Sequence, residues 1–409
     1  MNRPGKILLI AINFPPTRGG SVAVYGNLAR QAGGRIIVMA PQLHYQDGLP
    51  IIGWREQDRT ADFTTIRPKH LRTILDPTGP ANLRRRLSLI ADDIVLRASL
   101  FRHIVRVLRS EPIAAICVGE IVPSGWLLPI LKRVLRVRTA IYVHGEEIII
   151  AETYDPDHRR AARALAAADS IIVVSQFAAA AVEKLIGAAD TRKIHVIENG
   201  VDVAQFHPVG RRADLMEAYG LHGCFVYVTV CRLVEKKGVD MAIRGFASVL
   251  ARHPQTRLVI VGAGPAEADL RGLADSLGVT TAVTFAGDVS AADLVAHYCL
   301  GDVFVMPNRA LANGDTEGFG LVFLEANACG LPVIGGRDGG TSSAVEHDRN
   351  GLLVDGHSLA EITAAMLALR EDGALRERLA ATGLATAKAA GWQSKTDAFI
   401  AACLGTPAP

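Results

Sequence analysis

Short apolar runs rich in Val and Ile recur along the whole chain, and helix-length segments of mixed polarity separate them. Near-continuous apolar runs of this length are typical of strands buried on both faces of a sheet. Their alternation with helices predicts parallel sheets in an α/β fold. The predicted strands span residues 6–13, 35–41, 113–120, 139–145, 170–175 and 193–200, and then 225–231, 257–264, 282–288, 302–308, 331–336 and 351–354.

The alternation is interrupted between residues 200 and 210, where polar residues and Pro208 replace it. A chain of 409 residues is also longer than one ordinary core requires. We therefore expect two Rossmann-like parallel-sheet domains, 1–203 and 204–386, that face each other across a cleft. Residues 387–409 are predicted to form a terminal helix that crosses back to the first domain. Because open parallel sheets bind ligands at the carboxyl ends of their strands, the residues that follow each strand are the candidates for a site.

Composition and charge narrow the class of protein. Apolar residues make up 49% of the chain and charged residues 21%, as in globular proteins. The formal net charge of +3 argues against a dedicated nucleic-acid binder. The six cysteines are scattered and show no zinc-like spacing, and we interpret them as small buried apolar residues in a reducing compartment. The first apolar run is shorter than a signal peptide or a membrane helix requires, so we interpret the protein as cytoplasmic.

Two loops carry features that favour phosphate binding. Gly19 and Gly20 follow the first strand and precede a helix-like segment, where bare backbone N–H groups attract phosphate. Arg232 and Lys237 follow the strand at 225–231, and both side chains are common phosphate ligands. The alternatives are an ordinary strand-to-helix turn for the glycines and a solvated charge cluster for the two cations.

The segment TEGFGLVFLEANACG contains two carboxylates eight residues apart, Glu317 and Glu325. The glycines on either side of Phe319 permit a close turn, and the sequence after them has helical spacing. Carboxylates near a helix start gain from the helix dipole and can accept hydrogen bonds from a polyhydroxylated ligand. Backbone N–H groups from Gly318 to Leu321 are natural donors to sugar or phosphate oxygens. The alternative is a helix-start glutamate together with a surface glutamate.

His144 lies at the carboxyl end of the strand predicted at 139–145 and is followed by Gly145, Glu146 and Glu147. Its position at a strand end favours a role in the site over that of an ordinary structural histidine.

The stretch VGAGPAEADL, together with Asp288, resembles a dinucleotide-binding fingerprint. It therefore indicates a different class of protein, a hydride-transfer enzyme. That class would leave the paired cations and the paired acids unexplained.

The segment from Arg67 to Arg109 carries a net charge of +7, and LKRVLRVR at 131–138 adds +4. Leucines and isoleucines lie between these charges. Such a segment forms either an amphipathic surface that contacts anionic lipid or a solvated helix face.

Together these segments resemble the retaining glycosyltransferases of family 4, which have the GT-B fold. The resemblance rests on the glycine pair in the first loop, HGEE, ADSIIVVSQF, IENGVD, R-x4-K-G and EGFGLVFLEANACGLPVIGG, and it covers nearly the whole chain in the right order. Two departures are the serines at 342 and 343, where many members have a glutamate, and the polar insert RALANGD before Thr316.

The resemblance implies transfer of a hexose from a UDP- or GDP-sugar to an acceptor hydroxyl, with retention and without a metal or other cofactor. It implies a glycan or lipid-linked acceptor in the synthesis of envelope polysaccharide or glycolipid, and it leaves peripheral contact with an anionic membrane open. An NAD-dependent oxidoreductase and a non-catalytic binding protein remain the alternatives. The implied residues are Arg232 and Lys237 at the diphosphate, Glu317 at the sugar hydroxyls, Glu325 at the ribose, Gly318, Phe319, Gly320 and Leu321 at the donor, Gly19 and Gly20 closing from the other domain, His144 beside donor sugar and acceptor, and Gly287, Asp288 and Val289 at the base.

Overall fold

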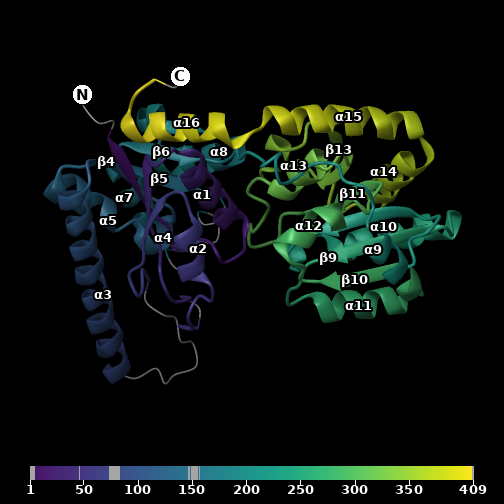
Figure 1. Ribbon diagram of the computed structural model, residues 1–409, viewed down its shortest axis with the longest axis horizontal. Coiled ribbons are helices and arrows are strands. Elements are labelled where there is room, and N and C mark those ends of the chain that lie inside the picture. Colours follow the sequence, from purple (N-terminus) through teal and green to yellow (C-terminus); the bar gives the residue numbers. More distant parts are fainter. Residues whose placement is uncertain are drawn as a thin grey trace. The chain divides into compact units, whose positions relative to one another are not determined.

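The computed structural model describes residues 5–45, 47–72, 83–145, 148, 155 and 157–407. The chain divides into two compact units, each built around one parallel sheet (Figure 1). The N-terminal unit comprises Met1–Val174, Ala178–Ile197 and Trp392–Pro409, and the C-terminal unit comprises Ser175–Phe177 and Glu198–Gly391.

Within the described residues, the N-terminal unit contains a seven-stranded sheet in the order β3-β2-β1-β4-β5-β6-β7. All of these strand pairs are parallel. The strands are β1 (Lys6–Ile10), β2 (Ile36–Met39), β3 (Thr64–Ile66), β4 (Ile113–Val118), β5 (Arg138–Val143), β6 (Ser170–Val173) and β7 (Ile194–Val196).

Helices cover both faces of this sheet. They are α1 (Gly20–Gln31), α2 (Trp54–Thr60), α3 (Leu83–Ser110), α4 (Ile121–Ser124), α5 (Leu127–Ile130), α7 (Arg159–Ala167), α8 (Gln176–Ile186) and α16 (Trp392–Leu404), with a π-helical turn η1 (Leu131–Leu135) and a 3₁₀ turn η3 (Ala188–Lys193).

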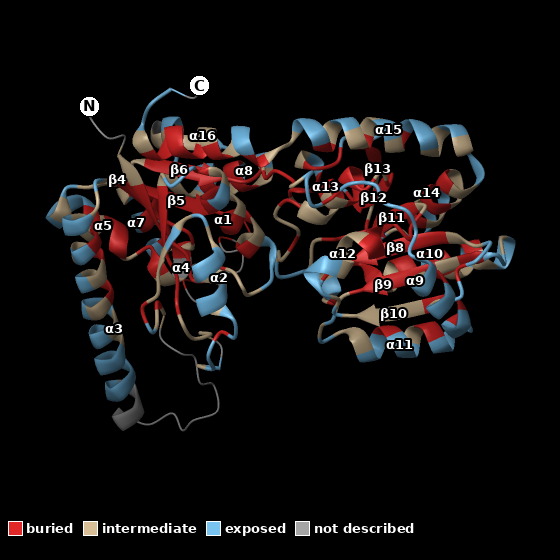
Figure 2. Cartoon of the chain, viewed as in Figure 1, coloured by how far each residue is buried: buried red, intermediate tan, exposed pale blue. Residues whose placement is uncertain are grey.

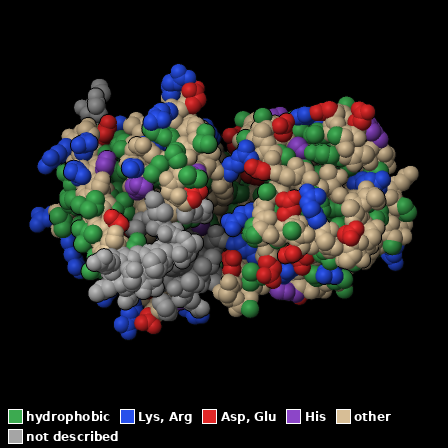
Figure 3. Space-filling model, turned by 90° about the horizontal axis from the view of Figure 1, so that it is seen from below, with side chains coloured by type: hydrophobic (Ala, Val, Ile, Leu, Met, Phe, Trp, Pro, Cys, Tyr) green, Lys and Arg blue, Asp and Glu red, His purple; other side chains and the backbone are tan. Residues whose placement is uncertain are grey.

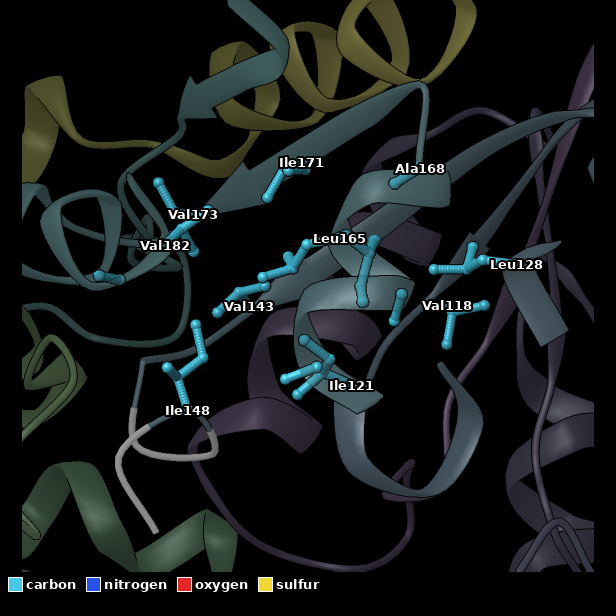
Figure 4. Packing of buried hydrophobic residues seen from close by; sticks show 14 of the residues in the cluster. Val118, Ile121, Leu128, Val143, Ile148, Leu165, Ala168, Ile171, Val173 and Val182 are labelled. Carbon is cyan, nitrogen blue, oxygen red and sulfur yellow. The ribbon is translucent and has the colours of Figure 1, made fainter. Parts of the chain in front are cut away.

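One face of the sheet is packed mainly with aliphatic side chains. Figure 4 shows Val143 of β5 and Val173 of β6 beside Leu165 of α7 and Val182 of α8. Further along the same face, α3 inserts the side chains of its C-terminal half into a second cluster with β1 and β2. The members of α3 in that cluster are Leu100, Ile104 and Val107.

The opposite face is covered by α1 and α16. Because side chains alternate along a strand, Tyr142 points away from its neighbours Ile141 and Val143. The Tyr142 ring lies 6.0 Å from Phe399 of α16, centroid to centroid. Two further contacts hold the end of α16 on the sheet, since Arg138 Nε donates to the Cys403 carbonyl at 2.9 Å and Ser170 Oγ donates to that of Ala402 at 2.7 Å.

In the described part of the C-terminal unit, six parallel strands form the order β10-β9-β8-β11-β12-β13. The strands are β8 (Phe225–Val230), β9 (Thr256–Val261), β10 (Val283–Gly287), β11 (Val303–Met306), β12 (Val333–Gly336) and β13 (Gly351–Val354). The helices are α9 (Ala213–Ala218), α10 (Val239–Arg252), α11 (Glu267–Ser276), α12 (Ala291–Tyr298), α13 (Leu321–Ala328), α14 (Leu359–Glu371) and α15 (Gly373–Ala389), with 3₁₀ turns η4 (Glu235–Lys237), η5 (Thr280–Ala282) and η6 (Thr341–Ser343).

The fold class predicted from the sequence is confirmed, since both units are parallel α/β sheets. Strands β8, β11 and β12 are buried along their whole length or nearly so (Figure 2), and β2 is fully buried as well. This burial explains why their sequences read as unbroken apolar runs. Sequence analysis missed β3, a three-residue edge strand with the sequence TTI. Along the chain, the two units divide between Ile197 and Glu198, and the last helix begins at Trp392 rather than at residue 387, which still belongs to α15.

No helix among the described residues combines the length and the apolar content that a membrane crossing needs.

The Phe399→Ala substitution should loosen α16 from the N-terminal sheet. The Phe399 ring is fully buried, and loss of such a ring from a core costs about 3–5 kcal/mol. Hydrogen exchange followed by mass spectrometry should become faster in α16, β5 and α1, whereas β8 and β11 keep wild-type rates. Gln393→Ala, at an exposed position of the same helix, is the control. Wild-type exchange in α16 of the Phe399 variant would contradict this packing role.

Candidate active site

Loops at the carboxyl ends of β8, β11 and β12 pack backbone against backbone in the C-terminal unit. Gly238 follows η4 with φ of 68°, and a Cβ atom there would lie 2.0 Å from the Pro307 carbonyl oxygen. A Cβ atom at Gly336 would lie 1.6 Å from the carbonyl oxygen of Asn308. Because only glycine allows these approaches, the three loops are fixed relative to one another.

The buried side chain of Asn308 connects two of these loops. Its Oδ1 accepts a hydrogen bond from Gly336 N–H at 3.1 Å, and its Nδ2 donates to Thr341 Oγ1 at 2.8 Å. Sequence analysis did not single out this residue. The available signal was a polar side chain directly after an apolar strand, at the position where parallel sheets place their sites.

The structure brings two predicted site residues into direct contact, although they are 80 positions apart in the sequence. The Lys237 ammonium group donates to the Glu317 carboxylate, and the two side chains are only 16% and 13% exposed. Lys237 reaches this position from η4, and Glu317 from the loop before α13. The ion pair therefore connects the β8 loop with the start of α13.

Both members of this pair are held in their charged forms. Burial by itself lowers the pKa of Lys237, but the Glu317 carboxylate outweighs burial, and the pKa of Lys237 is raised. Burial likewise raises the pKa of Glu317, whereas the charge and hydrogen bond of Lys237, the charge of Lys236 and the Phe319 N–H lower it, and the net pKa is lowered. An ammonium group has three N–H donors, so Lys237 can contact a phosphate oxygen while it keeps its bond to Glu317.

Lys236 fixes the segment that leads into Glu317. Its Nζ donates to Asp315 Oδ1 at 2.8 Å and to the Thr316 carbonyl at 3.1 Å, while Arg309 N–H donates to the Lys236 carbonyl at 2.9 Å. Sequence analysis predicted Lys237 but not its neighbour. An acid immediately before the TEG sequence, facing a Lys-Lys pair, was the only signal that could have indicated this contact.

The Arg232 side chain is exposed at the end of β8, and it forms no hydrogen bond or ion pair within the part of the chain that the structure describes. Its loop is nevertheless rigid, because Leu233 N–H donates to the Ala263 carbonyl at 3.0 Å. Arg232 is thus a cation on a fixed backbone whose guanidinium group is accessible to a ligand.

The glycines that resembled a dinucleotide fingerprint have a packing role. A Cβ atom at Gly262 would lie 1.9 Å from the Cys231 carbonyl oxygen, and one at Gly264 would lie 2.3 Å from that of Leu233. Both glycines therefore let the loop after β9 lie directly on the loop that carries Arg232. This accounts for the motif without a bound dinucleotide.

The turn at Gly318–Gly320 places Phe319 inside the protein and opens α13. Gly320 adopts φ of 90° at the N-cap position and supplies no side-chain acceptor to the first turn of the helix. A Cβ atom at Gly320 would lie 2.5 Å from the Phe323 ring. The first backbone N–H groups of α13, including that of Leu321, therefore start beside Glu317 without a capping side chain.

Glu325 is hydrogen-bonded to a residue that sequence analysis missed. The buried Tyr298 hydroxyl, at the end of α12, donates to Glu325 Oε2 at 2.7 Å. Burial raises the pKa of Glu325 to about 6, although the Tyr298 hydrogen bond acts in the opposite direction. The pKa of Glu325 is therefore raised and that of Glu317 is lowered, although both residues lie in one loop–helix segment, because only Glu317 has a cation beside it.

The predicted base-binding residues lie at the end of β10. Gly287 has φ of 72°, and its carbonyl accepts a hydrogen bond from Gly262 N–H at 2.8 Å. Asp288 is exposed and Val289 is half-buried. This segment thus adjoins the glycine loop after β9, which in turn adjoins the Arg232 loop.

The remaining predicted residues belong to the N-terminal unit. Gly19 has φ of 148° and precedes α1, and both it and Gly20 are exposed. His144 follows β5, and its Nε2 lies 2.8 Å from the Tyr25 hydroxyl. Burial lowers the pKa of His144 to about 4, so the ring is neutral at physiological pH. Glu146 and Glu147 lie outside the described residues.

Two family models match the chain. Residues 61–205 match the model described as Glycosyltransferase Family 4, and residues 214–385 match the model described as Glycosyl transferases group 1.

The chain also resembles curated proteins, some of them over nearly its full length. It is 32% identical over 387 residues to a GDP-mannose-dependent alpha-(1-6)-phosphatidylinositol monomannoside mannosyltransferase of Mycobacterium tuberculosis, covering 93% of this chain and 92% of that protein. The Mycolicibacterium smegmatis protein of the same name is 33% identical over 389 residues, with the same coverage. A D-inositol 3-phosphate glycosyltransferase of Acidothermus cellulolyticus is 35% identical over 297 residues, which cover 69% of this chain and 63% of that protein.

Solved structures share the fold at lower identity. Anabaena HepE in complex with UDP and glucose superposes with a TM-score of 0.72 at 21% identity, covering 99% of this chain and 100% of that one. WaaG, a glycosyltransferase involved in lipopolysaccharide biosynthesis, gives a TM-score of 0.66 at 16% identity, covering 98% of this chain and 100% of that one. The fold is therefore GT-B.

The raised pKa of Glu325 predicts a specific pH dependence of stability. Because the folded protein binds this proton more tightly than the unfolded chain does, Glu325 contributes stability below its ordinary pKa of 4.5, and this contribution is lost as the pH rises through about 6. It amounts to about 2 kcal/mol at most. Urea unfolding should show that, between pH 4.5 and pH 7, the free energy of unfolding of wild type falls by about this amount relative to that of Glu325→Gln.

The exposed Glu377 provides the matched control, because Glu377→Gln should follow wild type at both pH values. A difference between wild type and Glu325→Gln that stays constant from pH 4.5 to 7 would rule out this assignment.

Proposed function

The chain belongs to glycosyltransferase family 4, and from this premise we propose that it moves a hexose from a nucleoside diphosphate sugar to an acceptor hydroxyl, with retention and without a metal ion. In this proposal the C-terminal unit binds the nucleotide sugar and the N-terminal unit binds the acceptor. The observation that carries it is the buried Lys237–Glu317 pair beside the exposed Arg232, because this set offers cations to a diphosphate and a carboxylate to sugar hydroxyls.

Negative charge grows on the β-phosphate as the bond between the anomeric carbon and its phosphate oxygen breaks. Arg232 and Lys237 would meet this charge, with backbone N–H groups after Gly320 and in the Gly19–Gly20 loop as additional donors. Because glycine packing locks the loops that carry Arg232 and Lys237, these two cations would need little reorganisation when the bond breaks.

Glu317 would accept hydrogen bonds from the donor sugar, since its lowered pKa keeps it ionised. The acceptor oxygen would bond to the anomeric carbon on the face that the phosphate leaves, and the departing phosphate oxygen would take the acceptor proton. This route preserves the anomeric configuration and requires no protein nucleophile.

Glu325 would hold the ribose hydroxyls, and the backbone of Gly287, Asp288 and Val289 would contact the base. His144 would lie beside the donor sugar and the acceptor. An oxidoreductase is disfavoured, because the glycines that suggested it pack against the Arg232 loop.

The relatives give the proposal a donor and an acceptor class. Several are named as GDP-mannose-dependent mannosyltransferases that act on a phosphatidylinositol mannoside. We therefore take GDP-mannose as the donor and a lipid-linked glycan at the cytoplasmic face of a membrane as the acceptor, within envelope glycolipid synthesis.

A helix of the N-terminal unit fits contact with such a membrane. The C-terminal half of α3 packs into the core, but Leu87, Ile90, Ile94 and Val95 in its N-terminal half are 57–68% exposed. Lys and Arg side chains lie among exposed apolar ones on the face of this unit shown in Figure 3. Part of the basic segment that sequence analysis noted, residues 73–82, lies outside the described residues. A helix with exposed aliphatic and basic side chains fits the headgroup region of an anionic bilayer.

Arg232→Ala should abolish most of the transfer without affecting folding. Loss of one donor to the developing phosphate charge costs about 3–4 kcal/mol, or roughly 10²–10³ in rate. The assay measures mannose transfer from GDP-mannose to a phosphatidylinositol mannoside acceptor in EDTA, and NMR gives the anomeric configuration of the product.

The control is Arg244→Ala, which removes another exposed arginine, on α10, and should keep wild-type turnover. Near-normal turnover in Arg232→Ala would refute the phosphate assignment, an inverted product would refute retention, and strict dependence on added metal would refute the metal-free reaction.

The double substitution Ile90→Asn and Ile94→Asn should weaken membrane binding. Burial of one such side chain in the bilayer interface contributes about 1.5 kcal/mol or more, so partitioning should fall at least about tenfold. Co-sedimentation with phosphatidylglycerol vesicles measures it. Ile52→Asn, which alters an exposed isoleucine outside α3, is the control. Equal binding of all three proteins would exclude α3 as the contact.

A further inference from the structure

His144 lies beside two tyrosine rings that belong, like His144 itself, to the N-terminal unit. The His144 ring centroid is 5.3 Å from that of Tyr25, on α1, and 5.0 Å from that of Tyr142, on β5. Tyr25 and Tyr142 themselves meet edge to face at 5.6 Å, and Tyr142 packs on Phe399 of α16. The imidazole orientation is therefore restricted by two rings from different elements, one of which is supported in turn by Phe399.

The hydrogen bonds at Tyr25 determine the position of the imidazole proton. The Tyr25 hydroxyl donates to the carbonyl of Gly119, which can only accept. A phenol has a single proton, so the hydroxyl must accept from its second partner, His144 Nε2, at 2.8 Å. Nε2 consequently carries the proton of the neutral ring.

The backbone around Gly119 fits this arrangement. A Cβ atom at Gly119 would lie 2.8 Å from the Tyr25 hydroxyl oxygen, so a side chain there would obstruct the phenol. Gly119 N–H also donates to the Ile10 carbonyl at 2.8 Å, which holds the accepting carbonyl at the junction of β1 and β4. The phenol therefore bridges two fixed points, Gly119 and His144.

We infer that Tyr25 is a positioning residue, which holds His144 as a neutral imidazole with its proton on Nε2. The consequence for catalysis rests on the proposed function, whereas the tautomer itself does not. With Nε2–H committed to Tyr25, Nδ1 has no proton to donate, and the ring cannot act as a general acid toward the departing phosphate.

This arrangement agrees with the chemistry of the proposed transfer. The acceptor proton goes to the departing phosphate oxygen, so no protonated imidazole is required beside the donor. The lowered pKa of His144, which burial causes, works in the same direction. A ring of fixed orientation and tautomer would align substrate groups without adding a positive charge that competes with Arg232 and Lys237.

The tautomer can be measured directly in the wild-type protein. Long-range ¹H–¹⁵N spectra of ¹⁵N-histidine-labelled protein at pH 7.5, assigned with His144→Gln, should show a protonated Nε2 and an unprotonated Nδ1. In Tyr25→Phe, which keeps the ring but removes the hydroxyl, the two tautomers should mix. A proton on Nδ1 in wild type, or an unchanged His144 signal in Tyr25→Phe, would overturn the inference.

Kinetics then separate positioning from folding. Tyr25→Phe should lower kcat about tenfold while KM for the nucleotide sugar changes less than twofold. The control is Tyr219→Phe, which removes the hydroxyl of another Tyr–His pair, 3.1 Å from His297 Nε2 in the C-terminal unit, and should leave kcat unchanged. Unchanged kcat in Tyr25→Phe would overturn the positioning role. A wild-type protein with no transferase activity but a protonated Nε2 would contradict the proposed function and leave the tautomer assignment intact.

Discussion

The ion pair between Lys237 and Glu317 is the interaction on which the C-terminal site depends. Two charges held at 16% and 13% exposure are stable only when each compensates the other, since burial alone would favour both neutral forms. The pair also requires its two loops to approach closely, and glycines without room for a Cβ atom allow that approach. Backbone packing and side-chain charge are thus two parts of one constraint, because a side chain at Gly238 would displace the η4 turn that presents Lys237.

In the N-terminal unit, neutral hydrogen bonds and ring contacts take the place of the ion pair. Its predicted site residue, His144, contacts the tilted ring of Tyr142 and the hydroxyl of Tyr25, which the Gly119 carbonyl holds in turn. The difference follows from what each unit would contact in the proposed reaction. A diphosphate calls for cations that stay charged, whereas a sugar hydroxyl and an acceptor hydroxyl call for groups that orient without adding charge.

Sequence reasoning found what local patterns encode. Apolar strands buried on both faces gave twelve of the chain's strand positions close to where the sheets have them. Polar residues after those strands pointed to Arg232, Lys237 and His144, and the glycine-flanked turn before a helix pointed to Glu317. Tyr25 and Tyr298 could not be found in this way. Each belongs to a helix rather than to a loop after a strand, and its hydroxyl meets a partner from a distant segment, 119 residues away for Tyr25 and 27 for Tyr298. The loop glycines at Gly262 and Gly264 resembled a cofactor motif because close backbone packing and phosphate binding require the same residue type.

The charge balance of the C-terminal site shows why Arg232 differs from the two lysines. Lys236 is neutralised by Asp315 and Lys237 by Glu317, so these four side chains together contribute no net charge. Of the cations named in this site, Arg232 alone has no acid beside it among the described residues. A pyrophosphate would therefore be attracted mainly by Arg232 and by backbone dipoles, while Lys237 can share its N–H donors but must keep part of its interaction with Glu317. In the proposed reaction the two cations would thus have separate roles, Arg232 in attracting the donor and Lys237 in coupling the phosphate to the carboxylate that would face the sugar.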